Sequence, residues 1–142
     1  MSEANRQVAL AFMAAMGSND AKAAARCLHD DAVAVAKGTS RFAGTRSREM
    51  MLGGIAAFVD ILPDGLRFSD MRATAEGDRV LVEAKGNGVT ASGEKYDNDY
   101  CFAMTFRDDK IVHVNEYFCS RLADEVLWPL VQGTGNLDST VD

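Results

Sequence analysis

The sequence is poor in the residues that mark disulfide-rich, metal-binding or nucleic-acid-binding proteins. It has three cysteines and two histidines, and their spacing matches no zinc pattern. Acidic residues outnumber basic ones, 21 to 15, which gives a formal net charge of −6 and leaves no basic patch. Because phosphate backbones require a basic face, nucleic acid is not an expected partner. These scarcities predict a reduced, cytoplasmic protein without a metal site.

Long hydrophobic runs are also missing. The apolar stretch VALAFMAAM near the N-terminus is far shorter than the roughly 20 residues of a membrane span. Its larger residues, Val8, Phe12 and Met16, recur four apart, which indicates one face of a helix. No membrane contact is therefore expected.

Apolar residues themselves are plentiful, at 47% of 142 residues, which is enough for the core of one domain. We expect this domain to cover residues 1–131. The polar residues 132–142 are predicted to form a flexible tail.

The patterns place helices first and strands afterwards. Helices are predicted over residues 3–16, from about 20 to 29, and from 45 or 47 to 58, with a short strand near 30–38 and a loop between Gly38 and Gly44. Four strands follow, joined by short turns, and a last helical turn covers 121–127. The strands are Leu66–Ala75, Arg79–Gly88, Lys95–Arg107 and Ile111–Cys119. This order is typical of an α+β domain, with a strongly curved, mainly antiparallel sheet wrapped around three N-terminal helices.

The last two strands supply the best candidate for a pocket wall. Strand periodicity places Tyr96, Asn98, Tyr100, Phe102, Met104 and Phe106 on one face, and Val112, Val114, Glu116 and Phe118 on one face of the next strand. If these faces coincide, they form an apolar wall that carries a few isolated polar groups. The opposite face holds Cys101, Ala103, Thr105, His113, Asn115 and Tyr117. Because it has few charges, we expect a homodimer to cover it. Whether Cys101 and Cys119 pair stays open.

The order of elements and three segments, LHDDAVAV, GTRSREMM and NDYCFAMTFRDDKIVHVNEYF, resemble the SnoaL-like branch of the nuclear-transport-factor-2-like (NTF2-like) superfamily. The resemblance spans about Asn5 to Val126 and implies an NTF2-like cone. This superfamily includes ketosteroid isomerases, limonene epoxide hydrolase and polyketide cyclases, so the resemblance implies a fold more firmly than a reaction.

Differences in residue type at the positions of the relatives' catalytic groups argue against two of the relatives' mechanisms. The tyrosine, the aspartate base and the second aspartate of ketosteroid isomerases fall on Phe12, Lys37 and Phe102, so that mechanism is not expected. The Asp–Arg–Asp arrangement of epoxide hydrolases is not found either, because Asp97 and Asp99 face away from the predicted pocket.

Glu116 is the strongest catalytic candidate, because a carboxylate on an apolar face is desolvated and suited to proton transfer near neutral pH. The alternatives are an ion pair with Arg41, Arg79 or Arg121, or exposure to solvent at the end of the sheet.

Asn98 and Tyr100 are candidate donors to a substrate oxygen, although Tyr100 is also compatible with a place in the core. The residues predicted to contact substrate are Phe12, Met16, Val35, Lys37, Met51, Phe58, Phe102, Met104, Val114, Phe118 and Trp128.

Two functional hypotheses follow. The first is a cofactor-free isomerase, cyclase or hydratase that acts on a small, mostly apolar, oxygenated organic molecule. The second is a non-catalytic ligand-binding or dimerisation module of the same fold.

Overall fold

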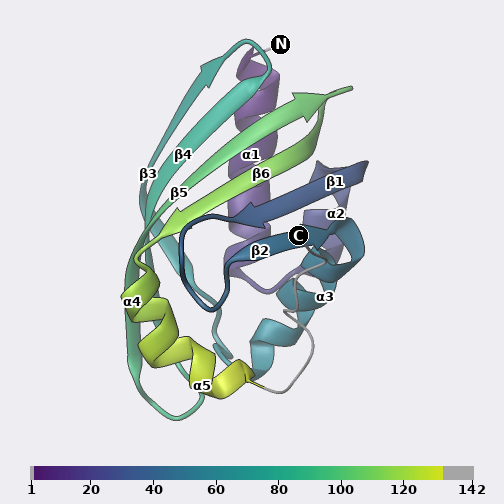
Figure 1. Ribbon diagram of the computed structural model, residues 1–142. Helices are drawn as coiled ribbons and strands as arrows, with labels where there is room; N and C mark the ends of the chain where they lie inside the picture. The colour runs from purple at the N-terminus through teal and green to yellow at the C-terminus, as the bar shows by residue number, and fades with distance from the viewer. Residues whose placement is uncertain (1, 133–142) are drawn as a thin grey trace.

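The computed structural model describes residues 2–132, which form three N-terminal helices, a six-stranded sheet and a short C-terminal helical segment (Figure 1). Apart from Gln132, the predicted flexible tail lies outside the described residues. The α+β class expected from the order of elements is confirmed.

Two of the three N-terminal helices begin at short polar side chains that cap them. Helix α1 covers Ser2–Gly17, and α2 covers Ala21–Cys27 after Asp20, whose side chain accepts a hydrogen bond from the Ala23 amide at 3.0 Å. Helix α3 covers Arg48–Ala57 and is capped by Ser47, as the sequence indicates. A 3₁₀ turn, η1 (Phe58–Asp60), continues from it.

The strands form one sheet in the order β2-β1-β6-β5-β4-β3. The predicted antiparallel meander is confirmed as β3 (Arg67–Glu76), β4 (Arg79–Val89), β5 (Lys95–Arg107) and β6 (Lys110–Phe118). Strand β1 (Leu28–Ala36) pairs in parallel with β6. Strand β2 (Gly44–Ser47) pairs with β1, where the sequence predicted the start of a helix after a loop.

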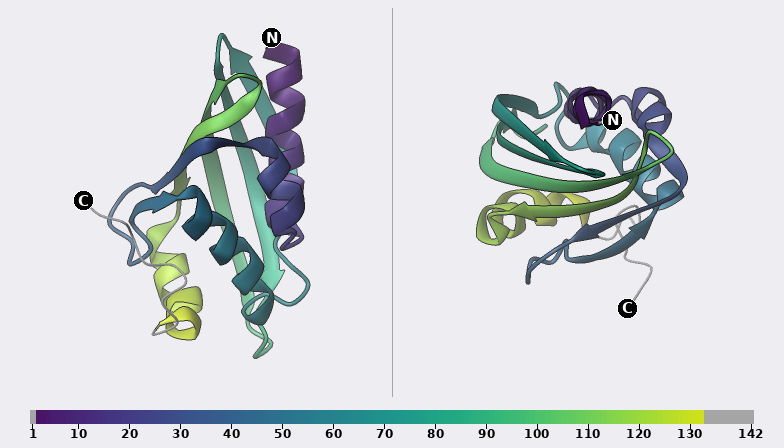
Figure 2. Two further views of the ribbon diagram at one scale, coloured as in Figure 1. Left: turned by 90° about the vertical axis from the view of Figure 1, so that its right-hand side faces the viewer. Right: turned by 90° about the horizontal axis from the view of Figure 1, so that it is seen from above.

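The sheet curves around the helices to make a cone, and residues 120–131 lie across its lower end (Figures 1 and 2). That C-terminal segment consists of α4 (Ser120–Leu122), the π-helix η2 (Ala123–Leu127) and α5 (Trp128–Val131). Among residues 2–132, no helix has the length and apolar character to cross a membrane.

Two apolar clusters divide the interior. The upper core packs α1 against the sheet, and its fully enclosed members include Phe12, Met13, Val80, Val82, Met104, Ile111 and Val114. The lower cluster joins the sheet to the C-terminal segment and includes Phe42, Ile61, Leu62, Tyr96, Ala123, Leu127 and Val131.

A β-bulge in β6 corrects the predicted facing of that strand. Thr105 pairs with His113 while Phe106 pairs with Ile111, so Val112 is an extra residue. Unbroken alternation would place Ile111 on the outer face with His113, but the bulge turns it inward and it is completely buried in the core. Beyond the bulge the alternation agrees with the prediction, and Glu116 faces inward.

The three cysteines of the chain are free thiols in the structure. Cys101 lies opposite Tyr117 on β6, and Cys119 follows the end of that strand.

Candidate functional site

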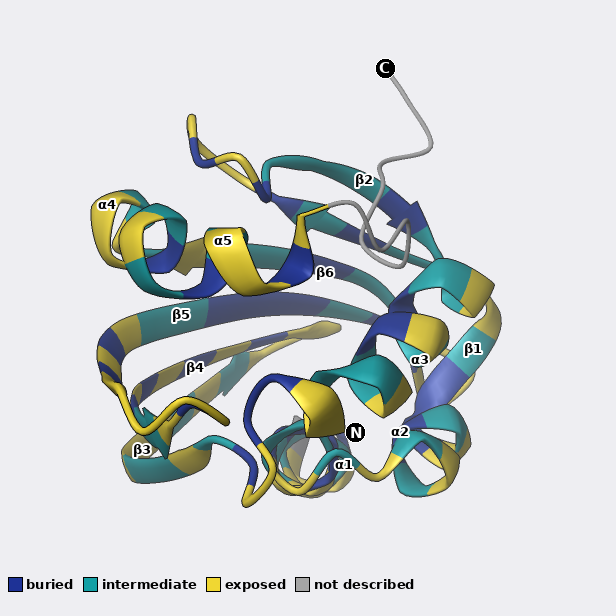
Figure 3. Cartoon of the chain, turned by 90° about the horizontal axis from the view of Figure 1, so that it is seen from below, coloured by how far each residue is buried: buried dark blue, intermediate teal, exposed yellow. Residues whose placement is uncertain are grey.

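A pocket of about 180 Å³ lies in the lower half of the cone and is partly open to solvent. The sheet, α3 and the C-terminal segment all contribute residues to its lining. Seen from below, α3 and the C-terminal segment lie beside the concave face of the sheet (Figure 3). Its lining consists of Met16, Asn19, Ala34, Ala36, Phe42, Arg46, Met50, Met51, Gly54, Ile55, Phe58, Leu62, Leu66, Phe68, Tyr96, Tyr100, Phe102, Glu116, Phe118, Ala123 and Leu127.

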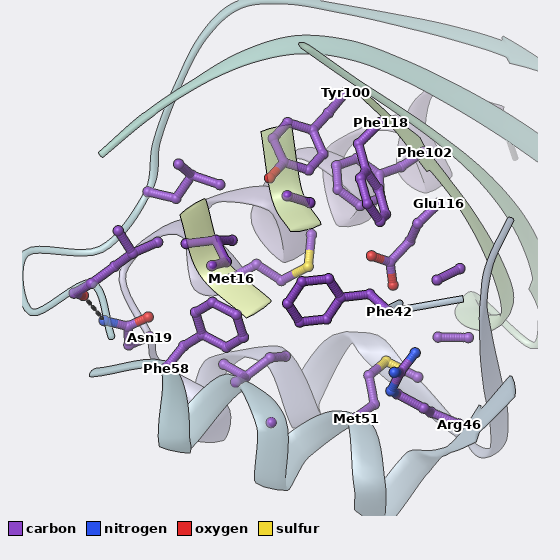
Figure 4. Close-up of a pocket in the computed structure, with 18 of the residues that line it drawn as sticks. Met16, Asn19, Phe42, Arg46, Met51, Phe58, Tyr100, Phe102, Glu116 and Phe118 are labelled. Atoms are coloured by element: carbon purple, nitrogen blue, oxygen red, sulfur yellow. Dashed lines mark hydrogen bonds between the residues drawn. The ribbon is translucent and has the colours of Figure 1, made fainter. Parts of the chain in front are cut away.

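Glu116 presents a carboxyl group to this apolar pocket from β6, opposite Phe102 of β5 (Figure 4). Burial raises the pKa of Glu116 above its ordinary value, and the positive charge of Arg46 partly opposes that rise. Within the described part of the chain, Glu116 forms no ion pair, so the expected alternatives with Arg41, Arg79 and Arg121 are not found. A carboxyl in this setting can release and take up a proton closer to neutral pH than a solvated one.

Two tyrosine hydroxyls lie beside each other in the same pocket. The Tyr96 and Tyr100 oxygens are 2.7 Å apart, and the Asn98 side-chain amide donates to the Tyr96 oxygen at 2.8 Å. The two tyrosines carry two hydroxyl protons, and one of these protons forms the hydrogen bond between the two oxygens. The other proton can therefore be donated to a ligand.

Both phenols stay protonated over the ordinary pH range. Burial, followed by the neighbouring Tyr96 hydroxyl, raises the pKa of Tyr100 well above its usual value. Burial also raises the pKa of Tyr96, although its hydrogen bonds with Tyr100 and Asn98 oppose the effect. The pair is consequently a hydrogen-bond donor and not a base.

Asn98, predicted to touch substrate, supports this pair from behind and is not in the pocket lining. It is 4% exposed. Its amide nitrogen also donates to the Cys119 carbonyl, and its oxygen accepts from the backbone amides of Asp99 and Cys119. Because every hydrogen-bonding group of Asn98 is in use, it has no donor left for a ligand.

Aromatic packing fixes the ring of Tyr100. It stacks on Phe102 with an interplanar angle of 3°, and Phe68 meets both rings edge-on. Gly86 on the neighbouring strand leaves the necessary room, since a Cβ there would lie 2.9 Å from the Tyr100 ring. The hydroxyl pair is thus held by rigid neighbours before any ligand arrives.

The structure brings together many of the residues that the sequence placed in the pocket. Those found in the lining are Met16, Met51, Phe58, Tyr100, Phe102, Glu116 and Phe118. Phe12, Met104 and Val114 lie deeper, in the upper core.

Three more predicted contacts also lie outside the lining. On β1, Ala34 and Ala36 face the pocket, so Val35 lies on the opposite face and Lys37, just beyond the strand, is exposed. Small alanines leave space for the pocket, whereas the larger valines face outward. Trp128 lies outside the lining and packs edge-on against Phe42 at 5.3 Å.

Sequence reasoning did not select Arg46, Phe42, Tyr96 or Asn19 for the site. Arg46 stands on β2, a strand too short to show a pattern. Phe42 was detectable as a lone aromatic residue between Gly38 and Gly44, and Tyr96 was assigned to the correct face without a role. Asn19 donates to the Leu62 carbonyl at 3.0 Å, a partner 43 residues away that no local pattern reveals.

Metal ligation finds no support in the described residues, where no three His, Cys, Asp or Glu side chains gather around a possible ion.

The family model for the SnoaL-like domain matches residues 9–114 of this chain. The search with this chain matched no curated protein.

Solved structures show the same architecture at low sequence identity. An NTF2-like protein from Burkholderia xenovorans is 24% identical, with a TM-score of 0.73 over 89% of this chain and 97% of that one. An LEH-like epoxide hydrolase from M. tuberculosis is 20% identical, with a TM-score of 0.72 over 92% and 94%. A provisionally assigned polyketide cyclase from Xanthomonas campestris is 19% identical, with a TM-score of 0.74 over 88% and 97%. These likenesses confirm the predicted NTF2-like fold.

Proposed function

Because this chain belongs to the SnoaL-like domain family, we propose that its pocket binds a small, mostly apolar, oxygenated organic molecule and moves a proton on it without a cofactor. The pocket carries little polar chemistry besides Glu116, Arg46 and the tyrosine pair. An apolar ligand with one oxygen suits such a lining, because the walls bury its carbon skeleton and the few polar groups orient it.

One observation carries this proposal: a desolvated carboxyl and a pair of proton-donating hydroxyls face the same pocket. In the proposed step, the Glu116 carboxylate takes a proton from the carbon next to a carbonyl group. The electron pair moves onto the carbonyl oxygen, and the tyrosine pair donates a hydrogen bond to the resulting enolate. Glu116 then returns the proton to a different carbon or to the original one. Isomerisation and cyclisation both begin with such a step.

A non-catalytic ligand-binding module is the second candidate. Within residues 2–132, Glu116 forms no hydrogen bond with Tyr100 or Asn98, and Asn98 is fully engaged elsewhere. The same pocket would then act only as a receptor.

Proton exchange separates the two candidates. Cyclohexanone is a one-ring ketone with exchangeable protons, and its deuteration in D₂O is followed by NMR. We expect the protein to accelerate exchange, the Glu116→Gln variant to lose the acceleration, and Glu94→Gln, at an exposed position in the turn between β4 and β5, to keep it. Exchange that persists in Glu116→Gln would refute the catalytic role. Binding of the ketone without any acceleration would favour the receptor.

We also propose that the outer sheet face pairs with a second copy of the chain. Leu81 and Tyr117 are exposed there, at 38% and 45%, although both lie on central strands of the sheet. Light scattering after size exclusion should give the mass of a dimer, and Tyr117→Glu should lower it to that of a monomer. A monomeric wild type at micromolar concentration would contradict the pairing.

A further inference from the structure

One wall of the pocket comes from neither the sheet nor a helix. Residues 37–43 connect β1 to β2, and Phe42 is the member of this loop that enters the lining. Figure 4 shows its ring reaching across the pocket toward Met16, below the carboxyl of Glu116. The side chain is 8% exposed, so its position is fixed by packing on most sides.

A carboxylate of the C-terminal segment holds this loop. The Asp124 Oδ1 atom accepts hydrogen bonds from the Ser40 hydroxyl at 2.6 Å and from the Arg41 amide at 2.9 Å. The Ser40 oxygen in turn accepts from the Phe42 amide at 3.0 Å. A continuous hydrogen-bonded chain therefore runs from Asp124 to the backbone of Phe42.

The local geometry of the C-terminal segment serves both the loop and the pocket. Residues 123–127 form a π-helix, in which the Trp128 amide donates to the Ala123 carbonyl. Ala123 and Leu127 line the pocket, while Asp124 between them faces the loop. Trp128 adds an edge-on contact with the Phe42 ring.

The size of the cavity indicates what fits beneath Phe42. At about 180 Å³ it is close to the engineered cavity of about 150 Å³ that binds benzene, and well below the ~300–1,000 Å³ of pockets for drug-sized ligands. One six-membered ring with a polar substituent fills such a space. The Phe42 ring reaches across this space, so it is a side chain that a second fused ring would meet.

We infer that Phe42 is the specificity-determining residue of this pocket, that Asp124 positions it, and that together they restrict ligands to a single ring bearing an oxygen. The inference rests on the proposed function only in taking the pocket as a site for small oxygenated molecules. It does not depend on proton transfer.

The test compares phenol with 2-naphthol, which differ by one fused ring, by calorimetric titration of the full chain. We expect the wild type to bind phenol in preference to 2-naphthol. Phe42→Ala should shift the ratio of the two affinities toward 2-naphthol by about tenfold or more, and Phe42→Leu should shift it less. Phe106→Leu, which alters an aromatic side chain of the upper core, serves as the matched control and should leave the ratio unchanged.

A second set of variants tests Asp124 without touching the ring. Asp124→Ala should relax the preference toward that of Phe42→Ala, whereas Asp124→Asn, which keeps an acceptor oxygen, should restore it. The double variant Phe42→Ala/Asp124→Ala should match Phe42→Ala alone, because Asp124 acts through Phe42. Trp128 is the single tryptophan of the chain, so its fluorescence should change in Asp124→Ala and report movement of the loop. Asp30→Ala, at an exposed residue of β1, is the control.

Each outcome decides a different claim. An unchanged affinity ratio in Phe42→Leu and Asp124→Ala overturns the inference, even if Phe42→Ala fails to fold. Failure of every variant to bind either probe overturns it together with the proposed function. Size selection by Phe42 without any ketone exchange supports the inference and refutes only the catalytic step.

Discussion

The upper and lower halves of the cone are built from the same strands but use them differently. In the upper core, Phe12 and Met13 of α1 share one apolar cluster with Met104 and Val114, and each of these four residues is at most 1% exposed. In the lower half, β5 and β6 present Tyr96, Tyr100, Glu116 and other groups to a cavity. A continuous strand can therefore supply a solid core at one end and a cavity lined by polar groups at the other.

The difference lies in how each half satisfies its buried groups. Aliphatic side chains of the upper core need only close packing, which is non-directional. The lower half buries hydroxyl, amide and carboxyl groups, and these need partners at fixed angles. The hydrogen bonds of Asn98 supply such partners to Tyr96 and to both backbone groups of Cys119. We therefore expect substitutions in the two halves to have different consequences.

Met104→Ala should have the largest effect on stability. This side chain is fully buried in the upper core, and large-to-small changes at such sites cost about 2–5 kcal/mol in the free energy of unfolding. Urea denaturation measures this loss, and the affinity for phenol should not change. Phe58→Ala, at a half-buried pocket residue, should cost less and should weaken phenol binding. An equal loss in the free energy of unfolding for Met104→Ala and Phe58→Ala would show that the two halves of the cone do not differ in packing.

Asn98→Ala should destabilise by an intermediate amount, about 1–3 kcal/mol, because it leaves buried backbone and hydroxyl groups without partners. Asn87→Ala is a suitable control, since the Asn87 amide bonds an exposed carboxylate, that of Asp97. Asn87→Ala should change the free energy of unfolding by no more than about 0.5 kcal/mol. If both substitutions cost the same in urea denaturation, the hydrogen bonds of Asn98 are not what stabilises the lower half.

Glu116→Gln should have the smallest effect, and its effect depends on pH. Burial raises the folded-state pKa of Glu116 above the ordinary value of 4.5, so the folded protein binds this proton more tightly than the unfolded chain. The resulting stabilisation is fully present below pH 4.5 and is lost as the pH rises through the folded-state pKa.

Relative to Glu116→Gln, the wild type should therefore become less stable across that window, by at most about 1.4 kcal/mol per pH unit. Denaturation in a series of buffers measures the difference, with Glu94→Gln as the exposed control. Two parallel curves would show that Glu116 is not desolvated.

Much of the fold was predictable because regular periodicity is a local property. The limits of β5 match the predicted strand at both ends, since thirteen residues of alternation leave little choice of register. Ser47 begins α3 as its capping chemistry indicates. Strand β2 was not predicted, because its four residues form a strand through pairing with β1, which no pattern within β2 records.

The site was less predictable because facing and partners are set by distant segments. Alternation on β1 separates Val35 from Ala34 but does not say which of them faces the pocket. The sequence shows that Asn98 shares a face with Tyr100. It does not show that the Asn98 side chain hydrogen-bonds the backbone of Cys119, 21 residues later. Phe42 depends on a carboxylate 82 positions further along the chain, at Asp124.

The extra residue at Val112 bears on how this pocket can arise and disappear over evolutionary time. Removing Val112 itself would leave a regular ladder in which Ile111 and Glu116 both keep their inward facing, because this residue is the one without a place in the pairing. A residue inserted or lost between Val112 and Glu116 would instead reverse the facing of Glu116, because side chains alternate along a strand. The interior acid of this lineage therefore tolerates loss of the bulge, whereas a change in length by one amino acid beyond the bulge turns it outward with no substitution at the acid.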